Sequence, residues 1–226
     1  MGKFQIVINK FKPLSNKSTD YYVSEMKNHP YSDETGWGYT DVMCVGDTVK
    51  ATLQKRVSTS YSIWNEVLQR VERQSFQIVV DVYFELDFQH HLFIAEGTNT
   101  QLNRVKQSFR HLFSNGFVYE EIFMLPADYL SLFSQAGMLV NVGELTINDF
   151  QYDGCLIGRY VAKPVSQSDV MNRLSEYDKK VIRVKMLINL KGEEGILTVT
   201  NKGVLSLDAS EDAEATLLDY LKLNIE

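Results

Sequence analysis

The chain repeats one order of elements: two strands joined by a turn, then an amphipathic helix. The first copy spans residues 76–113 and the second spans residues 181–223. A strand that alternates apolar and polar residues buries one face, and strands joined by short turns pair antiparallel. The repeated order therefore predicts antiparallel sheets with helices packed on one face. Neither copy contains a recognisable catalytic signature.

In the first copy, alternation from Val80 predicts a strand over 76–88, and residues 92–95 form the return strand. Thr98 and Gln101 have the spacing of a capping box at a helix start. The core-facing stripe of that helix is Leu102, Val105, Phe109, Leu112 and Phe113.

The second copy adds one strand. We expect strands over 181–188, 196–200 and 204–207, and a helix capped by Ser210. Leu217, Leu218 and Leu221 form the apolar side of that helix.

Elsewhere the patterns predict further strands and helices. The strands are residues 4–8, 42–45, 48–53, 117–124, 138–145 and 155–161, and the helices are residues 19–27, one from Pro126 and one capped by Ser168. Another helix begins at Ser60 and turns Ile63, Val67, Leu68 and Val71 to the core. The grouped strands predict an α+β fold of two related sheet–helix units, residues 1–125 and 126–226, or one continuous domain.

Composition restricts the class of protein. The chain has 226 residues, 44% of them hydrophobic, and a formal charge of −6. We find no apolar run of the roughly 20 residues that span a membrane. Cys44 and Cys155 match no metal or redox spacing. These features favour a cytoplasmic protein with no membrane partner and no cofactor.

Two basic groups are candidates for binding nucleic-acid phosphates. Arg104, Lys106 and Arg110 lie in the predicted helix of the first copy, which contains no acidic residue between 99 and 113. The second group is Lys179, Lys180, Arg183 and Lys185. The alternative for the helix is a solvated face whose partners are acids elsewhere.

Catalytic alternatives rest on few residues. Asp81, Glu85 and Asp87 share a strand face that could hold a metal ion for phosphodiester hydrolysis, although such faces are usually solvated. His90 and His91 are adjacent, so they point apart on a strand and suit one ion poorly. Cys44 has apolar neighbours that favour a buried thiol over a nucleophile.

An aromatic segment covers residues 17–40. It contains Tyr21, Tyr22, Tyr31, Trp37 and Tyr39. Such density suits either a partner interface or a small local core.

Residues 153–161, the Ser168 helix and residues 181–207 together resemble the recombination-associated RdgC family, and less closely the phage-exclusion RexA family. The likeness is in the order of elements, with almost no identical residues. A more general likeness is to the halves of TATA-binding-protein-like folds. The resemblance implies a non-enzymatic, DNA-associated protein, a dimer, that acts in recombination or phage–host conflict.

The leading hypothesis is therefore non-specific DNA binding. The alternatives are a protein-interaction subunit without DNA contact, such as a sensor or inhibitor, and a metal-dependent nuclease.

Overall fold

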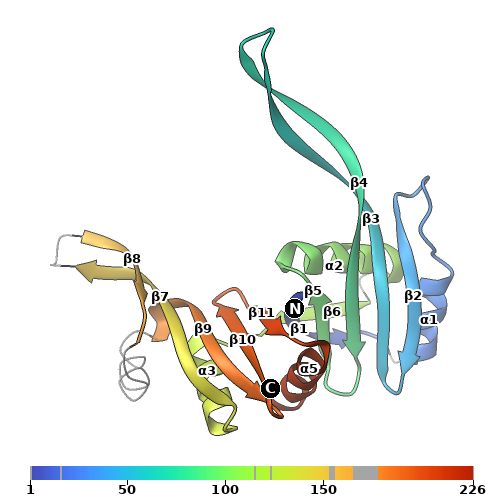
Figure 1. The fold of residues 1–226 in the computed structure, drawn as a ribbon. Helices are drawn as coiled ribbons and strands as arrows, with labels where there is room; N and C mark the ends of the chain where they lie inside the picture. The colour runs from blue at the N-terminus through green and yellow to red at the C-terminus, as the bar shows by residue number, and fades with distance from the viewer. Residues whose placement is uncertain are drawn as a thin grey trace. The chain divides into compact units, whose positions relative to one another are not determined.

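The computed structural model describes residues 2–15, 17–114, 116–122, 124–152, 156–164 and 178–225 (Figure 1). In chain order the elements are β1 (Gly2–Pro13), α1 (Thr19–Lys27), β2 (Trp37–Val45), β3 (Thr48–Asn65), β4 (Arg70–Asp87), β5 (Leu92–Glu96), α2 (Asn99–Phe113), β6 (Phe117–Glu121), α3 (Pro126–Gln135), β7 (Leu139–Tyr152), β8 (Leu156–Ala162), η1 (Asp178–Lys180), β9 (Val181–Leu190), β10 (Glu193–Thr200), β11 (Val204–Ala209) and α5 (Glu211–Asn224). The pairs β1–β11, β10–β11, β9–β10, β2–β3, β3–β4, β7–β8 and β7–β9 are antiparallel, which confirms the α+β class. The predicted Ser168 helix and Cys155 lie outside the described residues.

The chain divides into two compact units built from separate stretches. Unit 1 contains Met1–Phe11, Ile94–Asn103 and Tyr119–Glu226, and unit 2 contains Lys12–Phe93 and Arg104–Val118. Both units are thus discontinuous in sequence, whereas the predicted division near residue 125 is a single cut. The predicted division into residues 1–125 and 126–226 therefore stays a prediction.

Unit 1 contains a sheet in the order β1-β11-β10-β9-β7-β8. Helix α3 contacts β7, β9 and β10, and α5 contacts β9, β10 and β11. The two helices are neighbours, since the rings of Phe133 and Tyr220 lie 5.7 Å apart and the Tyr220 hydroxyl donates to the Leu132 carbonyl at 3.2 Å. Ser210 caps α5 by accepting from the Ala213 amide at 3.2 Å, as predicted. Both helices therefore cover one face of this sheet.

Unit 2 is built on the order β2-β3-β4-β5. The alternation that begins at Val80 buries Val82, Phe84 and Leu86. Phe109 of α2 packs on this face, with its ring 5.3 Å from Phe84 and 5.8 Å from Phe93. The capping box is confirmed at the start of α2, where the Thr98 amide donates to Gln101 Oε1 at 3.0 Å. Packing on this face fixes which face of α2 points away from the sheet.

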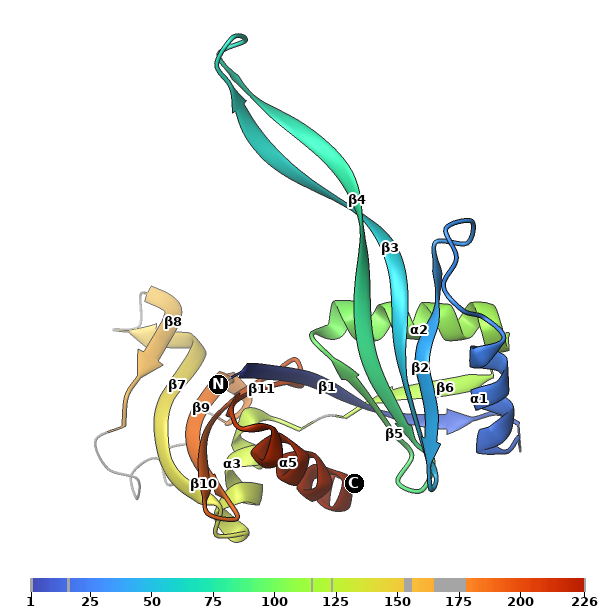
Figure 2. The same ribbon diagram turned by 45° about the vertical axis from the view of Figure 1, so that its right-hand side comes forward.

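The helix predicted from Ser60 is wrong. Its residues belong to a hairpin in which β3 and β4, each 18 residues long, pair from Thr48↔Asp87 to Asn65↔Arg70. Figures 1 and 2 show the outer half of this hairpin as a twisted two-stranded ribbon that extends beyond α2 and β2. Val67, predicted to be buried, is 91% exposed at the tip. Continuous pairing along two long strands fixes the register of this hairpin. It outweighs the helical spacing of four apolar residues, which was the basis of the predicted helix.

The tip contains a turn signal that the helical interpretation missed. The amides of Val67 and Leu68 both donate to Asn65 Oδ1 at 3.0 Å, which is the Asx geometry that starts many turns. Gln69 has a φ of 49°. That the chain is built of two related sheet–helix units stays a prediction.

Candidate nucleic-acid interface

The two predicted basic groups lie in different units. Arg104, Lys106 and Arg110 lie on α2 within unit 2. Lys179 and Lys180 form the end of η1, and Arg183 and Lys185 lie on β9, all within unit 1. The two groups are therefore considered separately.

Helix α2 presents its basic residues on two flanks. Leu102, Val105 and Phe109 are buried, so the remaining positions face outward or sideways. Successive helical residues are rotated by about 100°, which places Arg104 and Lys106 on opposite flanks. Arg110 follows Lys106 by one turn and shares its flank. The three cations therefore line both edges of the exposed helix surface.

The flank with Arg104 meets a cation that sequence reasoning missed. Lys55 of β3 donates from Nζ to Gln107 Oε1 at 3.3 Å, which places its ammonium beside α2. Burial, and secondarily the positive charge of Arg104, lower the pKa of Lys55. Neither Lys55 nor Arg104 forms an ion pair with a carboxylate among the described residues. Two like charges are thus held together on the surface of unit 2.

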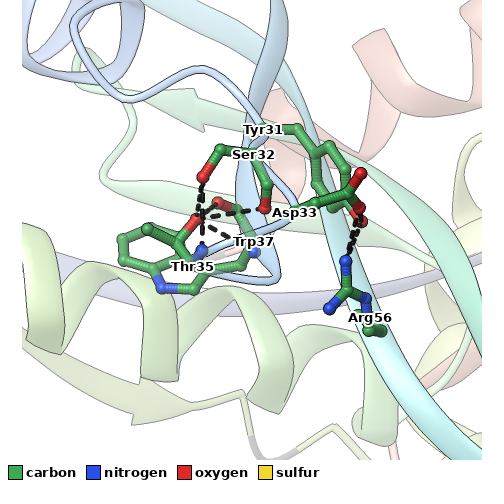
Figure 3. Close-up of polar contacts among 6 residues, drawn as sticks. All are labelled: Tyr31, Ser32, Asp33, Thr35, Trp37 and Arg56. Atoms are coloured by element: carbon green, nitrogen blue, oxygen red, sulfur yellow. Dashed lines mark hydrogen bonds and ion pairs between the residues drawn. The ribbon is translucent and has the colours of Figure 1, made fainter.

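The neighbouring cation on β3 is neutralised. Arg56 points to the opposite face from Lys55, because successive strand residues alternate. Its guanidinium donates to Asp33 and, at 3.4 Å, to the Tyr31 hydroxyl (Figure 3). The contact with the Tyr31 hydroxyl and, to a smaller extent, the contact with the Asp33 carboxylate raise the pKa of Arg56.

The loop that holds Asp33 is organised by Thr35. The Thr35 hydroxyl donates to the Trp37 carbonyl at 2.8 Å and lies 2.8 Å from Ser32 Oγ (Figure 3). These bonds hold the loop together, and the Arg56 amide of β3 donates to the Gly36 carbonyl of the same loop at 2.7 Å. The local fold therefore pairs Arg56 and leaves Lys55 beside Arg104.

The second basic group has a mixed environment. Lys179, Lys180 and Arg183 are exposed. Lys185 lies opposite Glu144 of β7 in the sheet register, so a carboxylate is close to its position. Opposite charges at facing positions attract each other. This group therefore has weaker support as a phosphate site than the Lys55–Arg104 pair.

The acidic strand face is largely buried, which corrects the expectation of a solvated face. Glu85 and Asp87 are each 3% exposed, and only Asp81 is exposed. Glu85 pairs with Lys50 at 2.9 Å, and Asp87 pairs with His90 Nδ1 at 2.9 Å. Within the described stretches, no three His, Cys, Asp or Glu side chains are grouped as a metal site.

The Cys44 thiol is exposed, so the expectation of a buried thiol is wrong. It lies at the end of β2 and donates to the Gly46 carbonyl at 3.2 Å. Apolar sequence neighbours do not bury a side chain at a hairpin end, where little packs against the strand.

The aromatic segment contributes to a local core. Tyr22 and Tyr39 are 1% and 2% exposed. The Tyr22 ring stacks on Phe88 with centroids 5.2 Å apart and meets Phe113 edge-on at 5.3 Å. Tyr21 remains partly exposed. The local-core interpretation therefore holds for Tyr22 and Tyr39.

Comparisons with known proteins add no family. Neither a protein-family model nor a curated protein matches this chain. The resemblance to RdgC and RexA stays a prediction. Across the described part of the chain, the helices are too short or too polar to span a membrane.

Proposed function

We propose that the protein is a non-enzymatic binding protein that associates with DNA through the exposed surface of α2 in unit 2. The observation that supports this proposal is the pair Lys55 and Arg104, which the fold brings together from β3 and α2. Holding two cations side by side costs free energy, and an anion that binds both offsets that cost. A phosphate backbone supplies such anions at regular spacing without base-specific contacts.

The charge of the helix supports the same proposal. Residues 99–113 contain no carboxylate, although the whole chain has a formal charge of −6. Local rather than total charge governs association with DNA. An alternative explanation for the basic residues of α2 is that Arg110 and His111, which lie in its last turn, stabilise the negative end of the helix dipole. Arg104 lies near the middle of the helix, so the dipole does not account for it.

Titration of labelled duplex and single-stranded DNA at two salt concentrations tests the proposal. We expect wild-type affinity to fall steeply with salt. A variant with Arg104→Ala, Lys106→Ala and Arg110→Ala should bind all sequences more weakly, and its salt slope should fall by roughly one unit per lost phosphate contact. Lys55→Ala should act in the same direction.

Lys27→Ala is the matched control, because Lys27 is an exposed cation of the same unit on another helix. It should leave both affinity and salt slope nearly unchanged. A folded triple variant with wild-type affinity and slope removes α2 from the interface. A parallel variant with Arg183→Ala and Lys185→Ala tests the predicted contribution of unit 1.

A protein-interaction subunit is the second candidate. The exposed apolar residues of the β3–β4 hairpin favour it, and wild type that binds no DNA at low salt would leave it as the leading candidate. The setting in recombination or phage defence, and the cytoplasmic location, stay predictions. In the described residues no grouping of metal ligands favours the nuclease alternative.

A further inference from the structure

A cavity of about 550 Å³ lies within unit 1. Its lining comes from β1, the start of α2, the connection from β6 to α3, and the β10–β11 turn. Cavities that bind small ligands have volumes of roughly 300–1,000 Å³. The cavity shares no residue with Lys55 or the basic residues of α2, so it is separate from the proposed DNA-binding surface.

One part of the lining is formed by β1 and the turn between β10 and β11. Strand β1 pairs with β11 as far as Val7, so Ile8 and Asn9 run on beside this turn. At the start of α2, Asn99 donates from Nδ2 to the Lys202 carbonyl of the turn at 3.0 Å. Sheet pairing and this hydrogen bond therefore hold β1, α2 and the turn around the cavity.

Another part of the lining is the connection that leads from β6 into α3. Glu121 is the last residue of β6, and the Leu125 amide donates to Asp128 Oδ2 at 2.7 Å at the start of α3. Ile122, Met124 and Leu125 are the apolar residues of this connection that line the cavity. The connection thus supplies two carboxylates and an apolar surface.

The charged residues of the lining do not neutralise one another. Lys202, Glu121 and Asp128 are all exposed. None of the three forms an ion pair with another residue that the structure describes. Asp128 already accepts a hydrogen bond from the backbone, which leaves Glu121 and Lys202 as one unpaired charge of each sign. A ligand with an ammonium and a carboxylate can pair with both.

The uncharged polar residues of the lining suit the same kind of ligand. They are the asparagines Asn9, Asn99 and Asn201. A side-chain amide has both donors and an acceptor, so it can bind a carboxylate or an ammonium. A simple anion such as phosphate would meet two carboxylates in this lining, and a simple cation would meet Lys202. The lining therefore fits a molecule that carries both charges and an apolar group.

We propose that this cavity binds a small zwitterion with an apolar side chain, either an α-amino acid or a dipeptide. Lys202 pairs with the ligand carboxylate and Glu121 pairs with its ammonium. The asparagine amides bind the same two groups, and the apolar side chain packs on Met124 and Leu125. Amino acid and dipeptide share this chemistry and differ in the separation of their two charges.

Isothermal titration calorimetry of the full chain, without nucleic acid, tests the proposal with four probes. They are L-leucine, L-leucyl-L-leucine, N-acetyl-L-leucine, which has no ammonium, and L-leucinamide, which has no carboxylate. We expect a zwitterion to bind about tenfold or more tightly than the two derivatives with a single charge, because each lost ion pair removes a charge-assisted hydrogen bond. The tighter of leucine and leucyl-leucine identifies the class of ligand.

Charge-removing variants assign the two ends of the ligand. Lys202→Met should weaken zwitterion binding by about tenfold and leave leucinamide binding unchanged, because leucinamide has no carboxylate to lose its partner. Glu121→Gln should weaken zwitterion binding similarly and leave N-acetyl-leucine binding unchanged. Lys191→Met is the matched control, since Lys191 is an exposed lysine of unit 1 at the other end of β10.

Three outcomes would overturn the proposal. The first is a wild type that binds neither zwitterion at millimolar concentrations. The second is equal affinity for leucine and its two single-charge derivatives, which would show that the cavity recognises only the apolar group. The third is a Lys202→Met or Glu121→Gln protein, folded by circular dichroism, that binds the zwitterion as wild type does.

Discussion

The Tyr39 hydroxyl donates a 2.8 Å hydrogen bond to Ser108 Oγ, and this buried bond joins β2 to α2. Ser108 in turn donates to the Val105 carbonyl at 2.8 Å, so the two hydroxyls form a short chain of hydrogen bonds. Burial raises the pKa of Tyr39, although the bond to Ser108 lowers it in part. The hydroxyl therefore keeps its proton and remains a donor.

Tyr39→Phe should lower the free energy of unfolding by about 0.5–1.5 kcal/mol, the usual net contribution of one hydrogen bond. The ring remains, so packing against Phe84 and Phe109 is kept. Urea unfolding measures the change. The matched control is Tyr22→Phe, since the buried Tyr22 hydroxyl has no hydrogen-bond partner within the described ranges. That variant should be neutral or slightly more stable, and equal losses in both variants would contradict the assignment.

Gly38 is a second position with a definite expectation. A Cβ added there would overlap the backbone of Pro30 and Tyr31, and the Tyr39 amide donates to the His29 carbonyl at 2.8 Å beside it. Gly38→Ala must therefore displace the loop from β2. We expect a loss of about 3 kcal/mol or more, within the range of severe backbone and overpacking effects.

Gly143→Ala is the comparison, because a Cβ at Gly143 meets only the Lys185 carbonyl, at an ordinary 3.6 Å. Its effect on the thermal midpoint should be small. A Gly38→Ala protein with the wild-type midpoint would show that the loop does not approach β2 this closely.

Lys55→Met should separate stability from DNA binding. Folding lowers the pKa of Lys55, so the unfolded chain holds that proton more tightly. The charge therefore costs stability below the folded pKa, and the cost disappears as pH rises to the ordinary lysine value. The side chain is only partly buried, so solvent screens its charge and the gain at pH 7 should be at most a few tenths of a kcal/mol. DNA affinity should fall in the same variant.

Lys50→Met is its counterpart on the same strand. Lys50 pairs with the buried Glu85, so removal of the ammonium leaves a buried carboxylate without its lysine partner. We expect a loss of roughly 1–3 kcal/mol in urea unfolding and little change in DNA affinity. A stabilised Lys50→Met protein would contradict the contrast between the two lysines.

Much of the local structure was predictable. Helix α2 follows from Thr98, Gln101 and the spacing of Val105 and Phe109, and β4 follows from the alternation after Val80. These signals lie within a few residues of one another, so they act before the chain is folded. The prediction for residues 60–71 failed because the spacing of their apolar residues fits a helix. In the structure, the antiparallel pairing that includes Thr48↔Asp87 continues through these residues as a hairpin.

The sequence by itself therefore determined the α+β class, most helix and strand positions, and the basic character of α2. Only the tertiary structure placed Lys55 beside Arg104, buried Glu85 and Asp87, and left Phe76 and Ile78 on a ribbon beyond the core. The physical reason is range. Capping and periodicity depend on neighbours in the chain, but burial and the charge around a side chain depend on which distant strand or helix packs against it.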